Sequence, residues 1–193
     1  TERSGVSPLI IKDDALIIKL SGKIDRIDLL PIDNNRYFGL VVDYKTMKKR
    51  DSILKQRIEN GLSFQLGIYI LYLKEVGAML NKEIIPCGGI FKSIIMKNKD
   101  KKILCQGIIL KDKTFETIVA KNDRMEENDF VSLFDSNKGK FVGYIKTRCR
   151  EIKKCRFDIT PLKLNNHLVC EYCEYKMFCR ISRYYNNPKI MEL

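Results

Sequence analysis

The chain has 193 residues, of which 45% are hydrophobic, enough apolar material for one globular domain with a buried core. Lys and Arg outnumber Asp and Glu by 36 to 24, and the formal net charge of +12 favours a polyanionic partner such as nucleic acid. A Lys-, Ile- and Asn-rich composition can produce the same charge without any partner, so charge alone does not decide the question. There is no apolar run of about 18 residues and no secretory leader, which argues against a membrane protein. Because Thr1 stands where an initiator Met would be, we expect a fragment of a longer protein.

Strand patterns dominate the first part of the chain. Residues 15–30 are β-branched and apolar with interleaved polar residues, and they predict a strand that ends at the turn-forming residues 31–35. Tyr37–Lys45 predicts a second strand. A short turn between two such runs favours an antiparallel pair, so we expect a hairpin with charged ends.

A buried helix is predicted next. Residues 47–60 are polar and basic, and Gly61 marks a loop. Apolar residues then recur at positions 62, 66, 70 and 73, the spacing of one helical face. Further strand-like runs bring the expected central sheet to four or five strands: Ile84–Met96, Ile103–Leu110 and Thr114–Val119.

Helical spacing returns in residues 126–154, in two pieces interrupted at 135–139. The predicted inward stripe of the second piece consists of Phe141, Ile145, Cys149 and Ile152. Its outward face carries Lys146, Arg150, Lys153 and Lys154. A basic helix face is usually only solvated, but beside a DNA-cutting site it can contact phosphates.

Two acidic residues and one lysine form the first candidate for chemistry. Asp43 and Lys45 are two residues apart in a predicted strand, so their side chains leave the same face. The preceding strand brings Asp25 to the same end of the hairpin. Two carboxylates can share a Mg²⁺ ion, and a lysine nearby can stabilise the charge that develops on a phosphate. The alternative is that all three are polar ends of edge strands.

The motif series resembles that of the PD-(D/E)XK nucleases of the RecB/AddB type. It consists of Gly-Lys-Ile-Asp-Arg-Ile-Asp at 22–28, Val-Val-Asp-Tyr-Lys-Thr at 41–46 and Gln-Leu-Gly-Ile-Tyr at 65–69. The resemblance continues through Pro-Cys-Gly-Gly-Ile-Phe at 86–91 and Gln-Gly-Ile-Ile-Leu at 106–110, and it covers residue 21 to the C-terminus. It implies a restriction-endonuclease-like α/β fold, a mixed central β-sheet flanked by helices. It also implies that Gln65 and Tyr69, neighbours on one helical face, lie against the active site; for Tyr69 the alternative is packing in the core.

Three of the seven cysteines are clustered near the C-terminus, as Cys170-X₂-Cys173-X₅-Cys179. Thiolates at this density select zinc or an iron–sulfur cluster, and either normally takes four ligands. His167, Cys155 or Cys149 are candidates for the fourth. The resemblance implies a [4Fe–4S] cluster whose fourth cysteine lies upstream, and also an upstream His, often with a Glu, that completes the catalytic metal site. The four cysteines outside the cluster are predicted to be small core residues: Cys87, Cys105, Cys149 and Cys155.

We therefore expect one nuclease domain over residues 1–193, with a cysteine-cluster segment at 155–193. The resemblance implies Mg²⁺- or Mn²⁺-dependent hydrolysis of DNA, as single strands or duplex ends, by a single-strand exonuclease. It further implies a helicase–nuclease partner subunit, a role in double-strand-break repair, and a bacterial cytoplasmic, nucleoid-associated location without a membrane. Three alternatives stay open: a CRISPR adaptation-type iron–sulfur nuclease, a non-catalytic DNA-binding module of the same fold, and a zinc-binding interaction domain.

Overall fold

The computed structural model describes residues 7–14, 16–96, 103–115 and 117–157, and towards the C-terminus residues 162–164, 167–168, 170, 173, 175–179 and 191–192. The chain falls into two compact units, residues 1–150 and 151–193. One domain over the whole chain therefore stays a prediction. No helix in the described ranges is long and apolar enough to cross a membrane.

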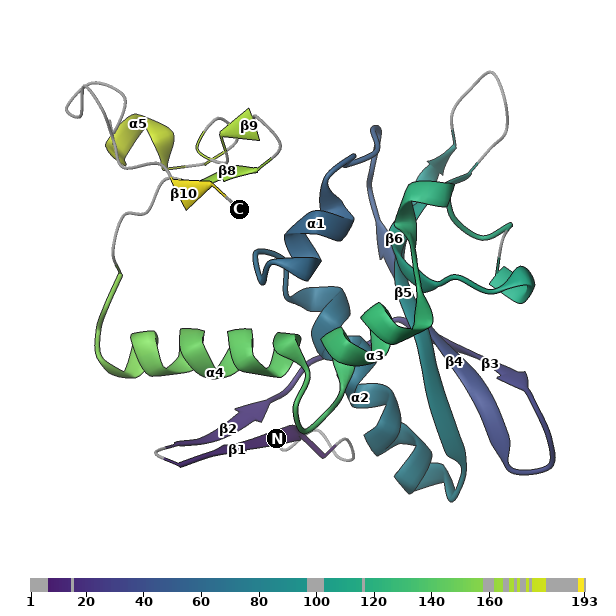
Figure 1. Ribbon diagram of the computed structural model, residues 1–193. Coiled ribbons are helices and arrows are strands. Elements are labelled where there is room, and N and C mark those ends of the chain that lie inside the picture. Colours follow the sequence, from purple (N-terminus) through teal and green to yellow (C-terminus); the bar gives the residue numbers. More distant parts are fainter. Residues whose placement is uncertain are drawn as a thin grey trace, which may run out of the picture. The chain divides into compact units, whose positions relative to one another are not determined.

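A mixed sheet forms the centre of the first unit (Figure 1). Among the described residues it has five strands in the order β3-β4-β5-β6-β7. They are β3 (Arg26–Pro31), β4 (Arg36–Lys45), β5 (Glu83–Met96), β6 (Ile103–Leu110) and β7 (Arg124–Met125). β3 and β4 pair in antiparallel fashion, whereas β4 and β5 are parallel, because a helical crossover returns the chain between them. The predicted hairpin, sheet and α/β class are confirmed.

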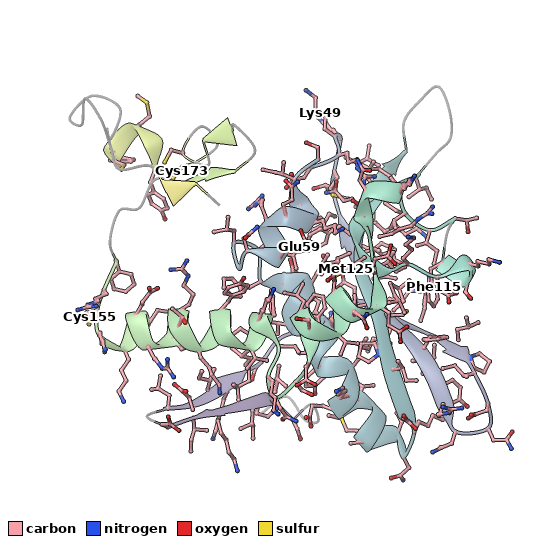
Figure 2. All side chains as sticks on the ribbon, in the orientation of Figure 1. Lys49, Glu59, Phe115, Met125, Cys155 and Cys173 are labelled. Atoms are coloured by element: carbon pink, nitrogen blue, oxygen red, sulfur yellow. The ribbon has the colours of Figure 1, made fainter. Side chains whose placement is uncertain are left out.

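Helices cover one face of this sheet. They are α1 (Leu54–Glu59), α2 (Gln65–Leu80), α3 (Glu127–Phe134) and α4 (Lys140–Lys153). The largest hydrophobic cluster joins all four helices to β5 and β6. A second cluster lies on the other face, where Phe115 (labelled in Figure 2) and Val119 pack against β4, β5 and β6. The sheet is thus buried on both faces.

The crossover helix begins later than the sequence suggests. Leu66, Ile70 and Leu73 are fully buried as predicted, but α2 starts at Gln65, not at Leu62. The N–H groups of Leu62 and Ser63 instead bond to the carbonyl of Arg57 and close the end of α1. This short helix, α1, was not predicted.

The predicted strand over 15–30 is wrong as one element. β2 (Leu16–Leu20) pairs with β1 (Leu9–Asp13) in a separate two-stranded antiparallel sheet, and β3 begins only at Arg26. Residues 21–24 between them are irregular. Because the alternating pattern continues through Ser21 and Gly22, the pattern alone does not show that the chain leaves one sheet and enters another.

The strand predicted over Thr114–Val119 is also wrong, since a 3₁₀ turn, η1 (Lys113–Phe115), lies there. A second, η2 (Lys121–Asp123), precedes β7. In α4, Phe141 and Ile145 are buried as predicted and Cys149 packs against the core, but Ile152 is 59% exposed. The apolar pattern of the sequence continues to Ile152, whereas the buried residues of α4 are Phe141, Val142 and Ile145.

The second unit has its own small sheet. Its described strands are β8 (Leu162–Leu164), β9 (His167–Leu168) and β10 (Met191–Glu192), in the order β10-β8-β9. A short helix, α5 (Lys176–Cys179), carries the last cysteine of the cluster.

Candidate active site

Asp43 lies near the C-terminal end of β4 with its side chain directed toward α2. Its neighbour on that face, Val41, packs against Leu73 of α2, and side chains two residues apart on a strand share a face. Asp43 is 3% exposed. Gln65, the first residue of α2, donates from Nε2 to Asp43 Oδ1 at 2.9 Å. The buried carboxylate is therefore oriented by the helix.

Lys45 follows on the same face of β4. Its Nζ lies 2.7 Å from Asp43 Oδ2, and 5.3 Å from the centre of the Phe91 ring on the adjacent strand β5. The side chain is 38% exposed. The ammonium thus has an anionic and an aromatic neighbour on the protein side and still faces solvent, where a phosphate can approach it.

Asp25 immediately precedes β3 and is exposed. Its Oδ2 accepts the backbone N–H of Tyr44 at 3.0 Å. The β3–β4 ladder ends at Arg26 opposite Val42, so continuing the register by one residue places Asp25 opposite Asp43. The three residues singled out from the sequence, Asp25, Asp43 and Lys45, are brought to one end of one strand pair.

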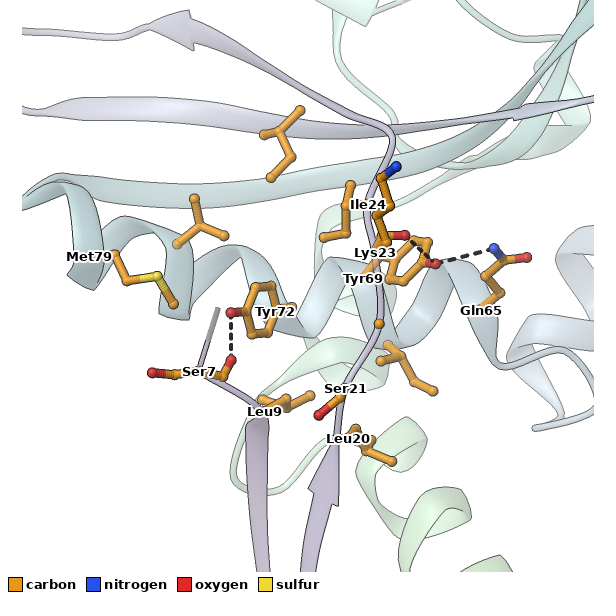
Figure 3. Close-up of a pocket in the computed structure, with 14 residues that line it drawn as sticks. Ser7, Leu9, Leu20, Ser21, Lys23, Ile24, Gln65, Tyr69, Tyr72 and Met79 are labelled. Carbon is orange, nitrogen blue, oxygen red and sulfur yellow. Dashed lines mark hydrogen bonds between the residues drawn. The ribbon is translucent and has the colours of Figure 1, made fainter. Parts of the chain in front are cut away.

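Tyr69 lies one turn after Gln65 on α2. Its hydroxyl is 3.3 Å from Gln65 Nε2 and donates to the backbone carbonyl of Lys23 at 2.8 Å (Figure 3). Helix α2 therefore forms hydrogen bonds both with Asp43 on β4 and with the backbone two residues before Asp25. The ring of Tyr69 also packs beside the Val41 and Leu73 cluster, so it combines core packing with a polar contact.

The two carboxylates fit a hard divalent cation. Asp43 Oδ2 is buried, and among the described residues its partner is the Lys45 ammonium at 2.7 Å. Asp25 keeps Oδ1 without a hydrogen-bond partner among the described residues. Two such oxygens suit Mg²⁺ or Mn²⁺, which keep several waters and need few protein ligands. No group of three or more His, Cys, Asp or Glu side chains gathers into a metal site within the described part of the chain.

Comparison with known proteins identifies the family. A model of the PD-(D/E)XK nuclease superfamily matches residues 2–180. The chain belongs to this superfamily. It is similar to proteins named as a subunit of an ATP-dependent helicase/deoxyribonuclease, at 27% identity over 91% of the chain in Ruminiclostridium cellulolyticum, 26% over 94% in Alkaliphilus metalliredigens and 24% over 83% in Clostridium perfringens. These matches cover 18%, 19% and 17% of the relatives, so the chain spans less than a fifth of their length.

A cavity of about 550 Å³ adjoins the nuclease-type site and was not foreseen from the sequence. Gln65 and Tyr69 form one wall, and the side chains of Tyr72 and Met79 continue it along α2 (Figure 3). Tyr72 donates its hydroxyl proton to the carbonyl of Ser7 at 2.6 Å. Positions 65, 69, 72 and 79 share one side of a helix, so their spacing in the sequence can predict this wall of the cavity. The residues of the other wall, such as Ser7 and Leu20, cannot be predicted from such a spacing.

The cysteine motif is not assembled as a metal centre in the described residues. Cys170 and Cys179 are half-buried and Cys173 is exposed. The N–H of Cys173 bonds to the carbonyl of Cys170 at 3.3 Å, a local turn. The side chain of His167 lies outside the described residues. An iron–sulfur or zinc site therefore stays a prediction, and we derive no chemical step from it.

The other cysteines follow the structural interpretation with one exception. Cys87 is buried between strands and donates to the Gly39 carbonyl, and burial raises its pKa to about 12, so its thiol stays protonated. Burial also raises the pKa of half-buried Cys105. Cys149 packs against the core. Cys155 is exposed, and its prediction as a core residue is wrong because it lies just beyond the end of α4.

Proposed function

We propose that this chain is a metal-dependent deoxyribonuclease domain that hydrolyses phosphodiester bonds at Asp25, Asp43 and Lys45. The observation that supports it is the convergence of these three side chains at one end of β3 and β4, with Gln65 bonded to Asp43. The buried Asp43 carboxylate, paired with the Lys45 ammonium, thus lies at the same strand end as the exposed Asp25 carboxylate, which is the set of charges that a metal-dependent phosphodiester hydrolase needs.

Asp25 and Asp43 would hold a Mg²⁺ or Mn²⁺ ion, which would supply Lewis-acid polarisation of the phosphate and lower the pKa of a bound water. The other roles belong to the chain itself. Lys45 places positive charge where the phosphorus centre gains negative charge. Gln65 holds the Asp43 carboxylate in position, and Tyr69 fixes the backbone that precedes Asp25.

The relatives' name supports a wider proposal. They are named as one subunit of a helicase/deoxyribonuclease. We infer that this domain acts on single-stranded DNA or duplex ends delivered by a helicase partner subunit, as an exonuclease in recombinational repair of double-strand breaks, in the bacterial cytoplasm at the nucleoid. We also infer that Cys170, Cys173 and Cys179 bind a [4Fe–4S] cluster with a fourth ligand from elsewhere in the protein, as a structural support for the C-terminal segment.

The test is Mn²⁺-dependent cleavage of end-labelled single-stranded DNA by the whole natural protein. We expect cleavage that disappears in the Asp43→Ala variant and in chelator. Glu75→Gln, which removes an exposed carboxylate elsewhere on α2, is the matched control and should keep full activity.

Each alternative predicts a different result. DNA binding without cleavage in the metal-loaded protein would overturn the nuclease proposal in favour of a non-catalytic module. Cleavage that requires no helicase partner, by a natural protein whose chain starts close to residue 1, would favour a stand-alone nuclease of the CRISPR adaptation type.

A further inference from the structure

Three buried polar side chains outside the active site all contact one loop. Within the described residues, the buried polar or charged residues are Asp43, Ser93, Gln106 and Asp123, each 3–5% exposed. Asp43 belongs to the active site. The other three bind residues 46–51, part of the segment between β4 and α1, which we call the anchored loop. Buried polar groups are costly unless they are paired, so these three side chains hold the loop in the one geometry that satisfies them.

Two of the anchors hold the backbone of the loop. Ser93 Oγ on β5 donates to the carbonyl of Met47 at 2.8 Å. Gln106 Oε1 on β6 accepts the N–H of Asp51 at 2.6 Å. Both anchors come from strands of the central sheet, so the loop is held against the C-terminal ends of β4 and β5, the end that carries Asp43.

The third anchor is an ion pair. Arg50 contacts the carboxylate of Asp123, which also accepts the N–H of Gly107 at 3.3 Å. Arg50 lies 3.5 Å from the carbonyl of Cys105 as well. Its guanidinium is therefore paired with a buried carboxylate on the protein side, with the side chain 29% exposed.

Lys48 and Lys49 lie between these anchors and are exposed. No described carboxylate is in ion-pair range of either ammonium. Figure 2 shows the labelled Lys49 side chain directed away from the ribbon. Three residues of chain span at most about 10 Å, so the backbone of Lys48 lies within that distance of Lys45. Two exposed positive charges are thus carried by an anchored backbone that begins within about 10 Å of Lys45.

We propose that the anchored loop binds the substrate strand, with Lys48 and Lys49 contacting backbone phosphates of single-stranded DNA next to the phosphodiester that is cut. This inference rests on the proposed nuclease function and specifies how its substrate is positioned. Phosphate contacts fix the register of a nucleic acid without reading its sequence. A loop held in place before binding loses less conformational entropy when the strand is bound.

The salt dependence of DNA binding tests the proposal. We would measure the affinity for a labelled single-stranded oligonucleotide over a range of salt concentrations, in an Asp43→Asn background that prevents cleavage. Each phosphate contact contributes about 0.7 to the slope of log affinity against log salt, so Lys48→Ala with Lys49→Ala should lower the slope by about 1.4. The control pair, Lys12→Ala with Lys19→Ala, removes two exposed lysines from the β1–β2 hairpin and should leave the slope unchanged. Equal slopes in the two double variants would overturn the proposal.

A second variant tests the anchoring itself. Ser93→Ala removes the bond to Met47 and keeps both lysines, so we expect an unchanged slope and an affinity about two- to tenfold lower. Thermal unfolding would show that the variant is folded. Wild-type affinity in folded Ser93→Ala would show that the anchors are not needed for binding.

The outcome is separable from that of the nuclease proposal. A protein that cuts DNA but shows no change of slope in the Lys48 and Lys49 variants loses the loop assignment alone. A protein that shows the change of slope but never cuts loses the nuclease assignment alone.

Discussion

Lys45 is the residue with the most direct predicted role in the reaction. Its ammonium is held between the buried Asp43 carboxylate and the Phe91 ring and is still open to solvent. Replacing it with a neutral side chain of similar length removes the positive charge and retains much of the apolar packing.

We therefore expect Lys45→Met to lower kcat about 10²–10³-fold with a smaller change in KM, because the charge acts mainly on the transition state. Lys82→Met is a matched control, since Lys82 also lies over an aromatic ring, that of Tyr37, at the opposite end of β4. Steady-state cleavage of labelled DNA gives both constants. A rise in KM at constant kcat would show that Lys45 only binds substrate.

Tyr69 is proposed to position the backbone before Asp25 through its hydroxyl. Tyr69→Phe removes only the bond to the Lys23 carbonyl and the contact with Gln65. Since supporting contacts of this kind typically change metal affinity or activity 10–100-fold, we expect cleavage to require about tenfold more Mn²⁺.

Tyr72→Phe is the control for this experiment. It removes a similar bond from the same helix, to the carbonyl of Ser7, but Tyr72 is not bonded to Gln65 or Asp43. Identical Mn²⁺ dependence in the two variants would mean that the Tyr69 hydroxyl is purely structural.

At the scale of elements, the position of α2 depends on its packing against α4. Gly67 faces the Phe141 ring, and an added Cβ would lie 2.1–2.5 Å from three of its ring atoms. Phe141 is fully buried, so the ring cannot move into solvent. The close approach of the two helices thus requires glycine at this position.

Gly67→Ala should reduce the free energy of unfolding by about 1–3 kcal/mol through overpacking. Gly143→Ala on α4 is the opposite case, because nothing lies within 4 Å of its added Cβ, and it should increase stability by about 0.5–1 kcal/mol. Urea unfolding of both variants measures the difference. Equal stability of Gly67→Ala and wild type would contradict the packing described for α2 and α4.

The β1–β2 hairpin is joined to α4 by a charged contact. Arg150 donates to both oxygens of Asp13, at 2.7 and 2.5 Å. On the basic face of α4, for which the sequence left solvation or phosphate contact open, Arg150 therefore has a structural partner. Hydrogen bonds from Arg150 lower the pKa of Asp13 below its ordinary value.

A lowered carboxylate pKa adds stability above the unfolded-state value, and that stability is lost as the pH falls through the folded-state pKa. We therefore expect Arg150→Ala to be less stable than wild type near neutral pH. The difference should shrink as the pH falls below about 4 and vanish once Asp13 is protonated. Thermal unfolding at several pH values checks this, and a difference that persists at low pH would show that packing of the arginine, not its charge, is responsible.

At the scale of the whole molecule, the metal content of the protein tests the proposed role of the cysteine motif. We expect the anaerobically purified natural protein to contain iron and sulfide, and Cys173→Ser to lose both. Cys105→Ser, outside the motif, should retain them. Zinc in place of iron would favour the zinc-binding interaction domain and overturn the cluster proposal.

Much of the site can be predicted from the spacing of residues close together in the sequence. Asp43 and Lys45 share a strand face, and Gln65 and Tyr69 share a helix face, because side-chain direction repeats every two residues in a strand and about every 3.6 in a helix. The antiparallel β3–β4 pair followed from a short turn. These relations need only a few consecutive residues, so the sequence determines them by itself.

Tertiary structure decided the rest. The contact of Gln65 with Asp43 depends on where α2 packs, and the division of residues 15–30 between two sheets depends on which strands find partners. The anchors Ser93, Gln106 and Asp123 come from separate elements and meet only at one loop. Such pairings are set by burial between residues distant in the chain, and neither periodicity nor local propensity carries that information.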